Sequence, residues 1–288
     1  MSKFNFSNIT NSQDILNISG LDFTVNKYPV ISNNVQSHEY FGLISSNNDF
    51  FGIAGKNYQL IQNSEFFSLV DILTAQNFKV TDAYQYKSKS IIKLTLDQKF
   101  KVNKVGDLFA VHIFISNDFS GKHACEYSIY LERLACKNGL KRNKKESSES
   151  VKHFRTFEEK LKIVEMMCLN ISDHLHTLDS NIQIMNESYL SDQKFNEYIN
   201  RILGIDDKKE VKTRLQNQKN DIIALYNNKP DLVNLNKSYY RAFNAVSDYY
   251  SHKNYKNSKD NNLILETSLV YNNDLSDAFE LALELSQN

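Results

Sequence analysis

The order of hydrophobic and polar residues changes character near the middle of the chain. In the first half, apolar and polar side chains alternate in short runs, as half-buried β-strands require. These runs lie at residues 21–31, 38–45, 49–55, 78–87 and 90–100. Residues 107–116 are continuously apolar, which predicts a central strand buried on both faces, with 123–131 as its partner. Pro29 predicts that the first strand ends there, at a sheet edge.

Two short helices are predicted among these strands. Asn11 or Ser12 can cap the first, and Gly20 can end it. Asn63 is a natural N-cap for the second. Apolar residues then follow at helical spacing, at Phe66, Phe67, Val70 and Leu73. The region from Leu21 to Tyr130 is therefore expected to be a mostly antiparallel sheet with one inserted helix.

The second half has a helical period. After the polar stretch 143–150, apolar residues alternate steps of four and three at Phe157, Leu161, Val164, Cys168, Ile171, Leu175, Leu178, Ile182 and Met185. This heptad stripe fits either a long helix packed inside its own domain or a coiled-coil seam between protomers. Further helices are predicted at 194–203, 211–228, 238–252 and 275–286, and Pro230 separates two of them. The prediction is an α+β fold with a β-rich domain at 1–148 and a helical region at 149–288.

Composition adds few constraints on function. Lys+Arg and Asp+Glu both number 34, so binding to nucleic acid would have to rest on a local patch. Three cysteines (Cys125, Cys136 and Cys168) are too few for a disulfide framework, which favours a reducing compartment. The N-terminus has no signal-peptide pattern, and no uncharged apolar run is long enough to span a membrane. We therefore expect a soluble cytoplasmic protein without a membrane partner.

No complete catalytic or metal-binding motif is present. His123, Cys125 and Cys136 offer three metal ligands, whereas structural zinc normally takes four in paired short spacings. The Gly-Lys pairs at 55–56 and 121–122 lack the spacing of a phosphate-binding P-loop. The expectation is therefore a protein that is not an enzyme and has no cofactor or metal.

Positive charge is concentrated in two segments, 87–104 and 133–145. If a helix begins near Leu131, Arg133, Lys137, Lys141 and Lys144 lie close to one face, although Gly139 weakens such a helix. Tyr84 and Tyr86 lie beside the first segment, and cations with aromatic rings suit a single strand of nucleic acid. A solubilising surface is the simpler interpretation. The predicted nucleic-acid-binding residues are Lys87, Lys89, Arg133, Lys137, Lys141, Arg142, Lys144 and Lys145.

Several segments, in order along the chain, carry a family resemblance. They lie at 20–30, 52–71, 115–120, 133–140, 152–161 and 243–252. In these segments the chain resembles the phage/plasmid-like proteins of the domain-of-unknown-function family numbered 932. It departs at 115–120, where the family commonly continues with His-Asp-Gly after its Ser-Asn turn. The resemblance implies residence on a mobile genetic element, and the sheet followed by a basic segment is broadly similar to phage single-strand annealing proteins.

Two functions are expected from these features. The first is a non-enzymatic protein that binds single-stranded DNA and promotes annealing or recombination. The alternative is an interaction protein that binds a host or phage protein and counters a host defence. A homo-oligomer is compatible with either, because annealing proteins commonly form rings and the heptad stripe could join protomers.

Overall fold

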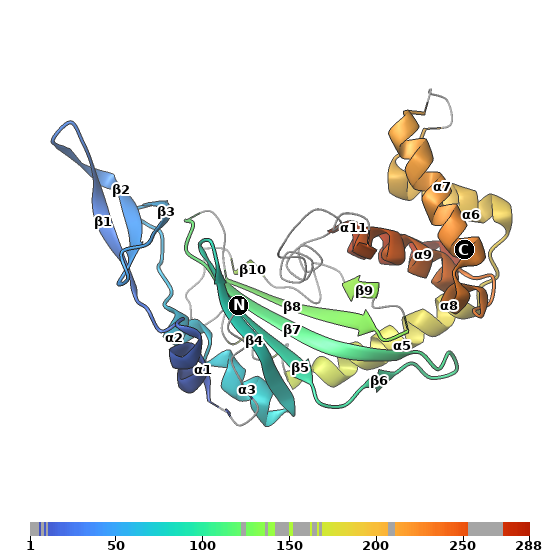
Figure 1. Cartoon of the computed structure of the whole chain (residues 1–288), viewed down its shortest axis with the longest axis horizontal. Coiled ribbons are helices and arrows are strands. Elements are labelled where there is room, and N and C mark those ends of the chain that lie inside the picture. The colour runs from blue at the N-terminus through green and yellow to red at the C-terminus, as the bar shows by residue number, and fades with distance from the viewer. Residues whose placement is uncertain are drawn as a thin grey trace. The chain divides into compact units, whose positions relative to one another are not determined.

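A computed structural model describes most of the chain as two compact units (Figure 1). It describes residues 11–121, 125–135, 138–141, 150–151, 169–206, 211–252 and 273–288, with Phe6, Ile9, Lys162 and Met166. The first unit comprises Met1–Asp97, His112–Ile129 and Lys145–Ile171. The second comprises Gln98–Val111, Tyr130–Lys144 and Ser172–Asn288. The predicted division at residue 148 lies outside the described residues and stays a prediction.

Helix α1 (Ser12–Ser19) has the predicted ends. The Asn11 side chain accepts a hydrogen bond from the Asp14 N–H at 2.8 Å, and Gly20 has the left-handed φ of 70° that helix ends favour. Helix α1 buries Ile15 and Leu16. Both predicted caps are therefore confirmed.

A three-stranded antiparallel sheet follows, in the order β1 (Val25–Ser32), β2 (Val35–Ser45) and β3 (Phe50–Gly55). Asn33 and Asn34 make the β1–β2 turn with φ values of 49° and 65°, as tight hairpins require. The prediction that the first strand ends at Pro29 is wrong, because β1 continues to Ser32. Its edge position is confirmed: β1 has one partner, and the register shifts just after Pro29, whose missing N–H an edge strand tolerates.

Helices α2 (Asn63–Phe66) and α3 (Leu69–Ala75) divide the predicted second helix in two. All four residues predicted to face the core are buried: Phe66, Phe67, Val70 and Leu73. The prediction of Asn63 as N-cap is wrong, because Gln62 is the cap. The buried Asn63 amide instead donates to the Leu21 carbonyl and the Ser90 hydroxyl, both at 2.9 Å, and its oxygen accepts from Asn117.

The larger sheet has the strand order β10-β8-β7-β5-β4, with β6 on β7 and β9 on β8. Its strands are β4 (Phe78–Tyr86), β5 (Lys89–Leu96), β6 (Phe100–Lys101), β7 (Leu108–Asp118), β8 (Cys125–Arg133), β9 (Asn138–Lys141) and β10 (Ser150–Val151). The predicted hairpin is β4–β5, and the predicted central strand is β7, which is buried from Phe109 to Asp118. Successive residues of a strand point to opposite faces of the sheet, so this unbroken burial shows that β7 is covered on both faces.

The predicted helix from Leu131 onward is wrong. Strand β8 runs to Arg133, and β9 returns antiparallel with Arg133 opposite Asn138 and Tyr130 opposite Lys141. Gly139 is a poor helix residue, and the aromatic and β-branched residues before it favour a strand. Arg133 and Lys141 therefore lie in two paired strands and not on one helix face, and Lys137 and Lys144 lie outside the described residues.

The second unit contains the helices predicted from the 3.6-residue period and, directly after Lys229, a short helix that this period does not predict. They are α5 (Ile171–Glu187), α6 (Asp192–Leu203), α7 (Thr213–Asn228), α8 (Pro230–Val233), α9 (Tyr239–His252) and α11 (Asn273–Ser286). Helix α9 is buried along most of its length and packs on α7, α8 and α11. In the described part of the heptad stripe, Leu178, Ile182 and Met185 are buried within the single chain, as the intramolecular interpretation requires. The predicted α+β class is confirmed.

Candidate functional site

The two predicted lysines of the first unit differ in their surroundings. Lys87 is exposed at the β4–β5 turn, with its ammonium 5.4 Å from the centroid of the Tyr86 ring. The Lys89 side chain is 19% exposed, and its ammonium lies 3.5 Å from the Glu126 carboxylate and 3.9 Å from that of Asp118. Lys87 is therefore the more accessible cation for an anionic partner.

The other predicted cations lie in the second unit or outside the described residues. Arg133 is 3% exposed and lies inside the fold. Lys141 is in strand β9. The remaining predicted residues fall outside the described residues: Lys137, Arg142, Lys144 and Lys145. A nucleic-acid role for this set stays a prediction, with Arg133 in a position that suits a structural role.

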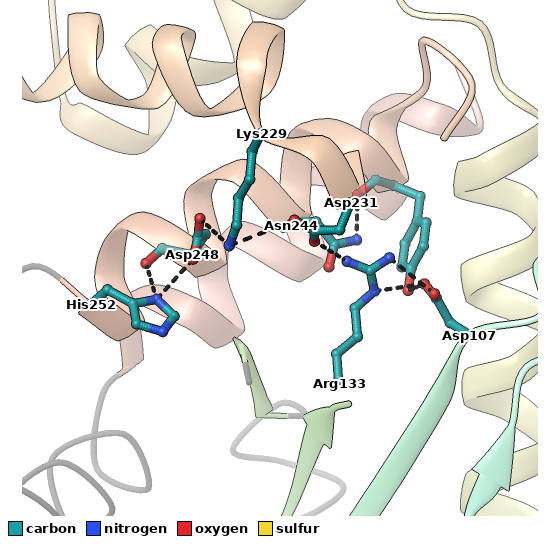
Figure 2. A network of polar contacts seen from close by, with 8 residues as sticks. Asp107, Arg133, Lys229, Asp231, Asn244, Asp248 and His252 are labelled. Atoms are coloured by element: carbon teal, nitrogen blue, oxygen red, sulfur yellow. Dashed lines mark hydrogen bonds and ion pairs between the residues drawn. The ribbon is translucent and has the colours of Figure 1, made fainter. Parts of the chain in front are cut away.

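Arg133 joins two carboxylates in the second unit (Figure 2). Its Nε and Nη2 donate to the two oxygens of Asp107 at 2.8 and 3.0 Å, and its Nη1 donates to Asp231 at 2.8 Å. The Tyr240 hydroxyl donates to Asp107 at 2.6 Å. Burial and the Asp107 charge raise the pKa of Tyr240 well above its ordinary value, so the phenol keeps this proton. The guanidinium therefore connects the end of β8 to α8 and to the loop before β7.

A second set of charges continues from this point. The Lys229 ammonium lies 3.9 Å from Asp231 and 2.6 Å from Asp248, and His252 Nδ1 lies 2.8 Å from the other oxygen of Asp248 (Figure 2). Pro230 begins α8 directly after Lys229, and the i, i+4 spacing on α9 brings Asp248 and His252 to one face. We call the set His252, Asp248, Lys229, Asp231, Arg133 and Asp107 the charge chain, in which basic and acidic groups alternate.

The pKa values of His252 and Asp248 are shifted in opposite directions. Burial opposes ionisation of Asp248, but hydrogen bonds from His252 and Lys229 outweigh it and lower the pKa of this carboxyl. The hydrogen bond to Asp248 raises the pKa of His252, against a smaller opposing effect of burial. Both shifts favour the ionised pair.

Replacing His252 with glutamine is expected to destabilise the protein in a pH-dependent way. The folded pKa of His252 is above its ordinary 6.5, so its stabilisation is complete below that value and is lost as the pH rises through the folded pKa. The Asp248 contribution is present above about 3.8 and is lost on acidification. Because the imidazole is half exposed, the loss at about pH 5.5 should stay below about 1 kcal/mol, with little change at about pH 8.5.

Urea unfolding at both pH values measures this effect, and His38→Gln, an exposed histidine of β2, is the control. An equal loss at both pH values would show that the imidazole acts through packing alone.

The charge chain ends in a groove of about 710 Å³ between α7 and α9. From α7 it is lined by Asp221, Ala224, Leu225 and Asn228, which share one helix face. From the last turn of α9 it is lined by Asp248, Tyr249 and His252, with Lys229 between the helices. Its size is in the range of small-molecule sites, and it combines apolar walls with a few polar groups.

A different feature lies on the three-stranded sheet of the first unit. Four large side chains are each at least 50% exposed: Tyr28, Tyr40, Phe50 and Ile53. Tyr28 and Ile53 are both opposite Gly42, Tyr40 is two residues before Gly42, and Phe50 is opposite Ile44. A Cβ at Gly42 would lie 3.3 Å from the Phe50 ring, so these groups share one side of the sheet. We call these four residues the aromatic face.

The opposite side of this sheet packs inward. The Phe51 ring stacks on Phe119 at 5.6 Å between centroids and lies 5.6 Å from Phe23. Rings on the two sides therefore have different environments. Sequence reasoning missed the aromatic face, although an aromatic at the exposed phase of a strand was a usable signal.

Comparison with known families gives one match. The family model described as Domain of unknown function (DUF932) matches residues 50–270. The chain belongs to this family. The whole charge chain lies inside the DUF932 match, whereas Tyr28 and Tyr40 of the aromatic face precede it.

Other comparisons return no relative of this DUF932 protein. Neither the search of curated proteins nor the search of solved structures gives a match. Among the described helices, none has both the length and the apolarity to cross a membrane. The described residues hold no group of three or more His, Cys, Asp or Glu side chains that could bind a metal, but His123 and Cys136 lie outside them.

Proposed function

We propose that this DUF932 protein binds single-stranded DNA without reacting with it, and that the aromatic face provides the stacking surface. The observation that carries the proposal is the exposure of three rings on one side of an antiparallel sheet. Soluble proteins seldom leave several large apolar side chains together in water without a partner. Exposed rings on a sheet are the means by which many proteins hold unpaired bases, because every base has a face that stacks.

The charges near the rings determine how much stacking and phosphate contacts should each contribute to the DNA affinity. None of the four residues of the aromatic face is charged, so stacking supplies most of its contribution. Phosphate contacts would come from exposed lysines of the same unit, such as Lys87. The salt dependence of the affinity then reports how many of these cations act, since each neutralised phosphate of a single strand adds about 0.7 to the slope.

Replacing Tyr28, Tyr40 or Phe50 singly with alanine is expected to weaken oligothymidylate binding by about 5- to 150-fold, because one stacked base is worth about 1–3 kcal/mol. Fluorescence anisotropy with a labelled strand at low salt gives the affinity. The control is Tyr189→Ala, an exposed tyrosine of the second unit. Equal affinities for the wild type and all three variants would show that the aromatic face does not bind DNA. If the wild-type protein does not bind the strand even at low salt, the proposed DNA-binding function is wrong.

Promotion of annealing or recombination on a phage or plasmid is a further part of this proposal. It is supported by the resemblance to phage/plasmid-like proteins and by the broad similarity to phage annealing proteins. A fluorescence-quenching assay with complementary strands tests it, because binding alone would leave the annealing rate unchanged.

A host or phage protein as partner is the second candidate. Ile31 and Val35 are also exposed near the β1–β2 turn, and uncharged aliphatic side chains suit a protein interface better than a phosphate backbone. This candidate predicts that the alanine variants keep oligonucleotide affinity and lose a co-purifying partner.

A further inference from the structure

The groove between α7 and α9 lies in the second unit and has no part in the proposed stacking surface. Its apolar walls are Ala224 and Leu225, which suit a hydrocarbon portion of a ligand, and the ring of Tyr249. Its polar groups decide what the rest of the ligand must be. Three of them, Lys229, Asp248 and His252, already satisfy one another.

The remaining charge of the groove is negative. Asp221 is an exposed carboxylate of α7, and its charge adds to burial in raising the pKa of Tyr249 to about 12, while Arg214 acts in the opposite direction. Helix α7 ends at Asn228 and α9 at His252, so both helices direct the negative ends of their dipoles towards this region. A phosphate or carboxylate ligand is therefore disfavoured.

This helix pair already holds two cations of the chain itself. The Lys229 ammonium bonds to Asp248 of α9 at 2.6 Å. The Arg241 guanidinium of α9 donates from Nε and Nη2 to the Tyr226 carbonyl of α7 at 3.1 and 2.6 Å, and lies 4.5 Å from the centroid of the Tyr226 ring. A cation on an apolar stem is thus a group that these surfaces are built to accept.

We propose that the groove between α7 and α9 binds an organic cation, an alkylammonium or guanidinium group on an apolar stem. The head lies at Asp221, and the stem lies along Leu225, Ala224 and the Tyr249 ring. The ligand is either a free polyamine or a lysine or arginine side chain of a partner protein, since the recognised chemistry is the same.

His252 makes this binding depend on pH. Its protonation adds a positive charge to the groove, where it is held by Asp248 beside Lys229 and acts against a second cation. Deprotonation removes that repulsion and leaves Asp221 to attract the ligand. Binding is therefore tighter above the pKa of His252 than below it.

Calorimetric titration of the full chain tests the proposal with three probes: spermidine, N-acetyl-arginine amide and inorganic phosphate. We expect saturable binding of a cationic probe at about pH 8 and a loss of about fivefold or more at about pH 6. Asp221→Asn should weaken it by about tenfold, or about 1.4 kcal/mol. The matched control is Asp277→Asn, which removes an exposed carboxylate of α11.

The variants and the choice of probe distinguish between the possible results. His252→Gln should bind the cation at both pH values with one affinity, and thermal unfolding confirms that each variant is folded. Spermidine binding indicates a free polyamine, and binding of the amide alone indicates a protein side chain. Binding of neither cation, tighter binding of phosphate, or equal losses in Asp221→Asn and Asp277→Asn would each overturn the proposal without affecting DNA binding.

Discussion

Replacing Arg133 with methionine is expected to lower the free energy of unfolding by about 3–5 kcal/mol. Arg133 is 3% exposed, and its guanidinium makes three hydrogen bonds to two carboxylates, Asp107 and Asp231. Methionine has a similar length and fills the space, so the loss comes from charge. Without the guanidinium, Asp107 keeps only the Tyr240 hydroxyl among these partners, and Asp231 keeps only the more distant Lys229 ammonium, at 3.9 Å.

Urea unfolding at neutral pH measures this loss. Arg133→Lys should recover part of it, because an ammonium keeps the charge but cannot form the bidentate contact to Asp107. The control is Lys104→Met, which breaks an exposed pair with Glu187 and should cost less than about 1 kcal/mol. If Arg133→Met and Lys104→Met lose the same stability, Arg133 is not the structural link that its contacts indicate.

The prediction for strand β7 is correct and the prediction for Arg133 is not, and this contrast shows which features of a fold can be predicted from the sequence. The continuous apolar run at 107–116 predicts a buried central strand because burial on both faces requires that pattern locally. The sign of the Arg133 charge is equally clear, but its partners lie 26 and 98 residues away in the chain. Local patterns carry no information on such distant pairing, so the sequence predicts a surface position for an arginine that is buried in the fold.

The prediction that Asn63 caps the second helix is wrong for the same reason. A residue of this type before an amphipathic run is a good N-cap by local rules, and the helix does begin at this point. The N-cap is Gln62, one residue earlier than predicted, because the Asn63 side chain instead forms hydrogen bonds with Leu21, Ser90 and Asn117 in the folded core. Tertiary hydrogen bonds outweigh a capping preference of about 1 kcal/mol when the amide is buried.

The aromatic face could have been predicted from the sequence. Leu21, Phe23 and Val25 set the buried phase of the first strand, and all three are buried. Tyr28 lies at the opposite phase, so strict alternation predicts an exposed ring at that position. The groove was not within reach, because α7 and α9 are separated along the chain by α8 and their packing depends on the whole unit.

Replacing Gly52 with alanine is expected to lower the free energy of unfolding by about 3 kcal/mol. A Cβ at Gly52 would lie 2.3 Å from the Ser120 carbonyl oxygen and 2.8 Å from its carbon, so backbone must move on one side. Gly121 has a φ of 77°, and a Cβ at this position would likewise lie 2.5 Å from the Ile53 carbonyl oxygen. Strand β3 and the β7–β8 turn thus meet through two glycines, and a methyl group at either one requires the backbone to shift.

Gly55→Ala is the matched control, because its added methyl would meet nothing closer than 3.9 Å and its φ is not in the left-handed range. Its stability should stay within about 1 kcal/mol of the wild type. Since Phe50 and Ile53 flank Gly52 in β3, a displaced strand should also weaken oligonucleotide binding if the aromatic face holds the bases. A Gly52→Ala protein as stable as Gly55→Ala would show that the contact with Ser120 is looser than 2.3 Å implies. A destabilised variant with unchanged DNA affinity would instead separate the attachment of β3 from the stacking of bases, and would count against the aromatic face as the binding surface.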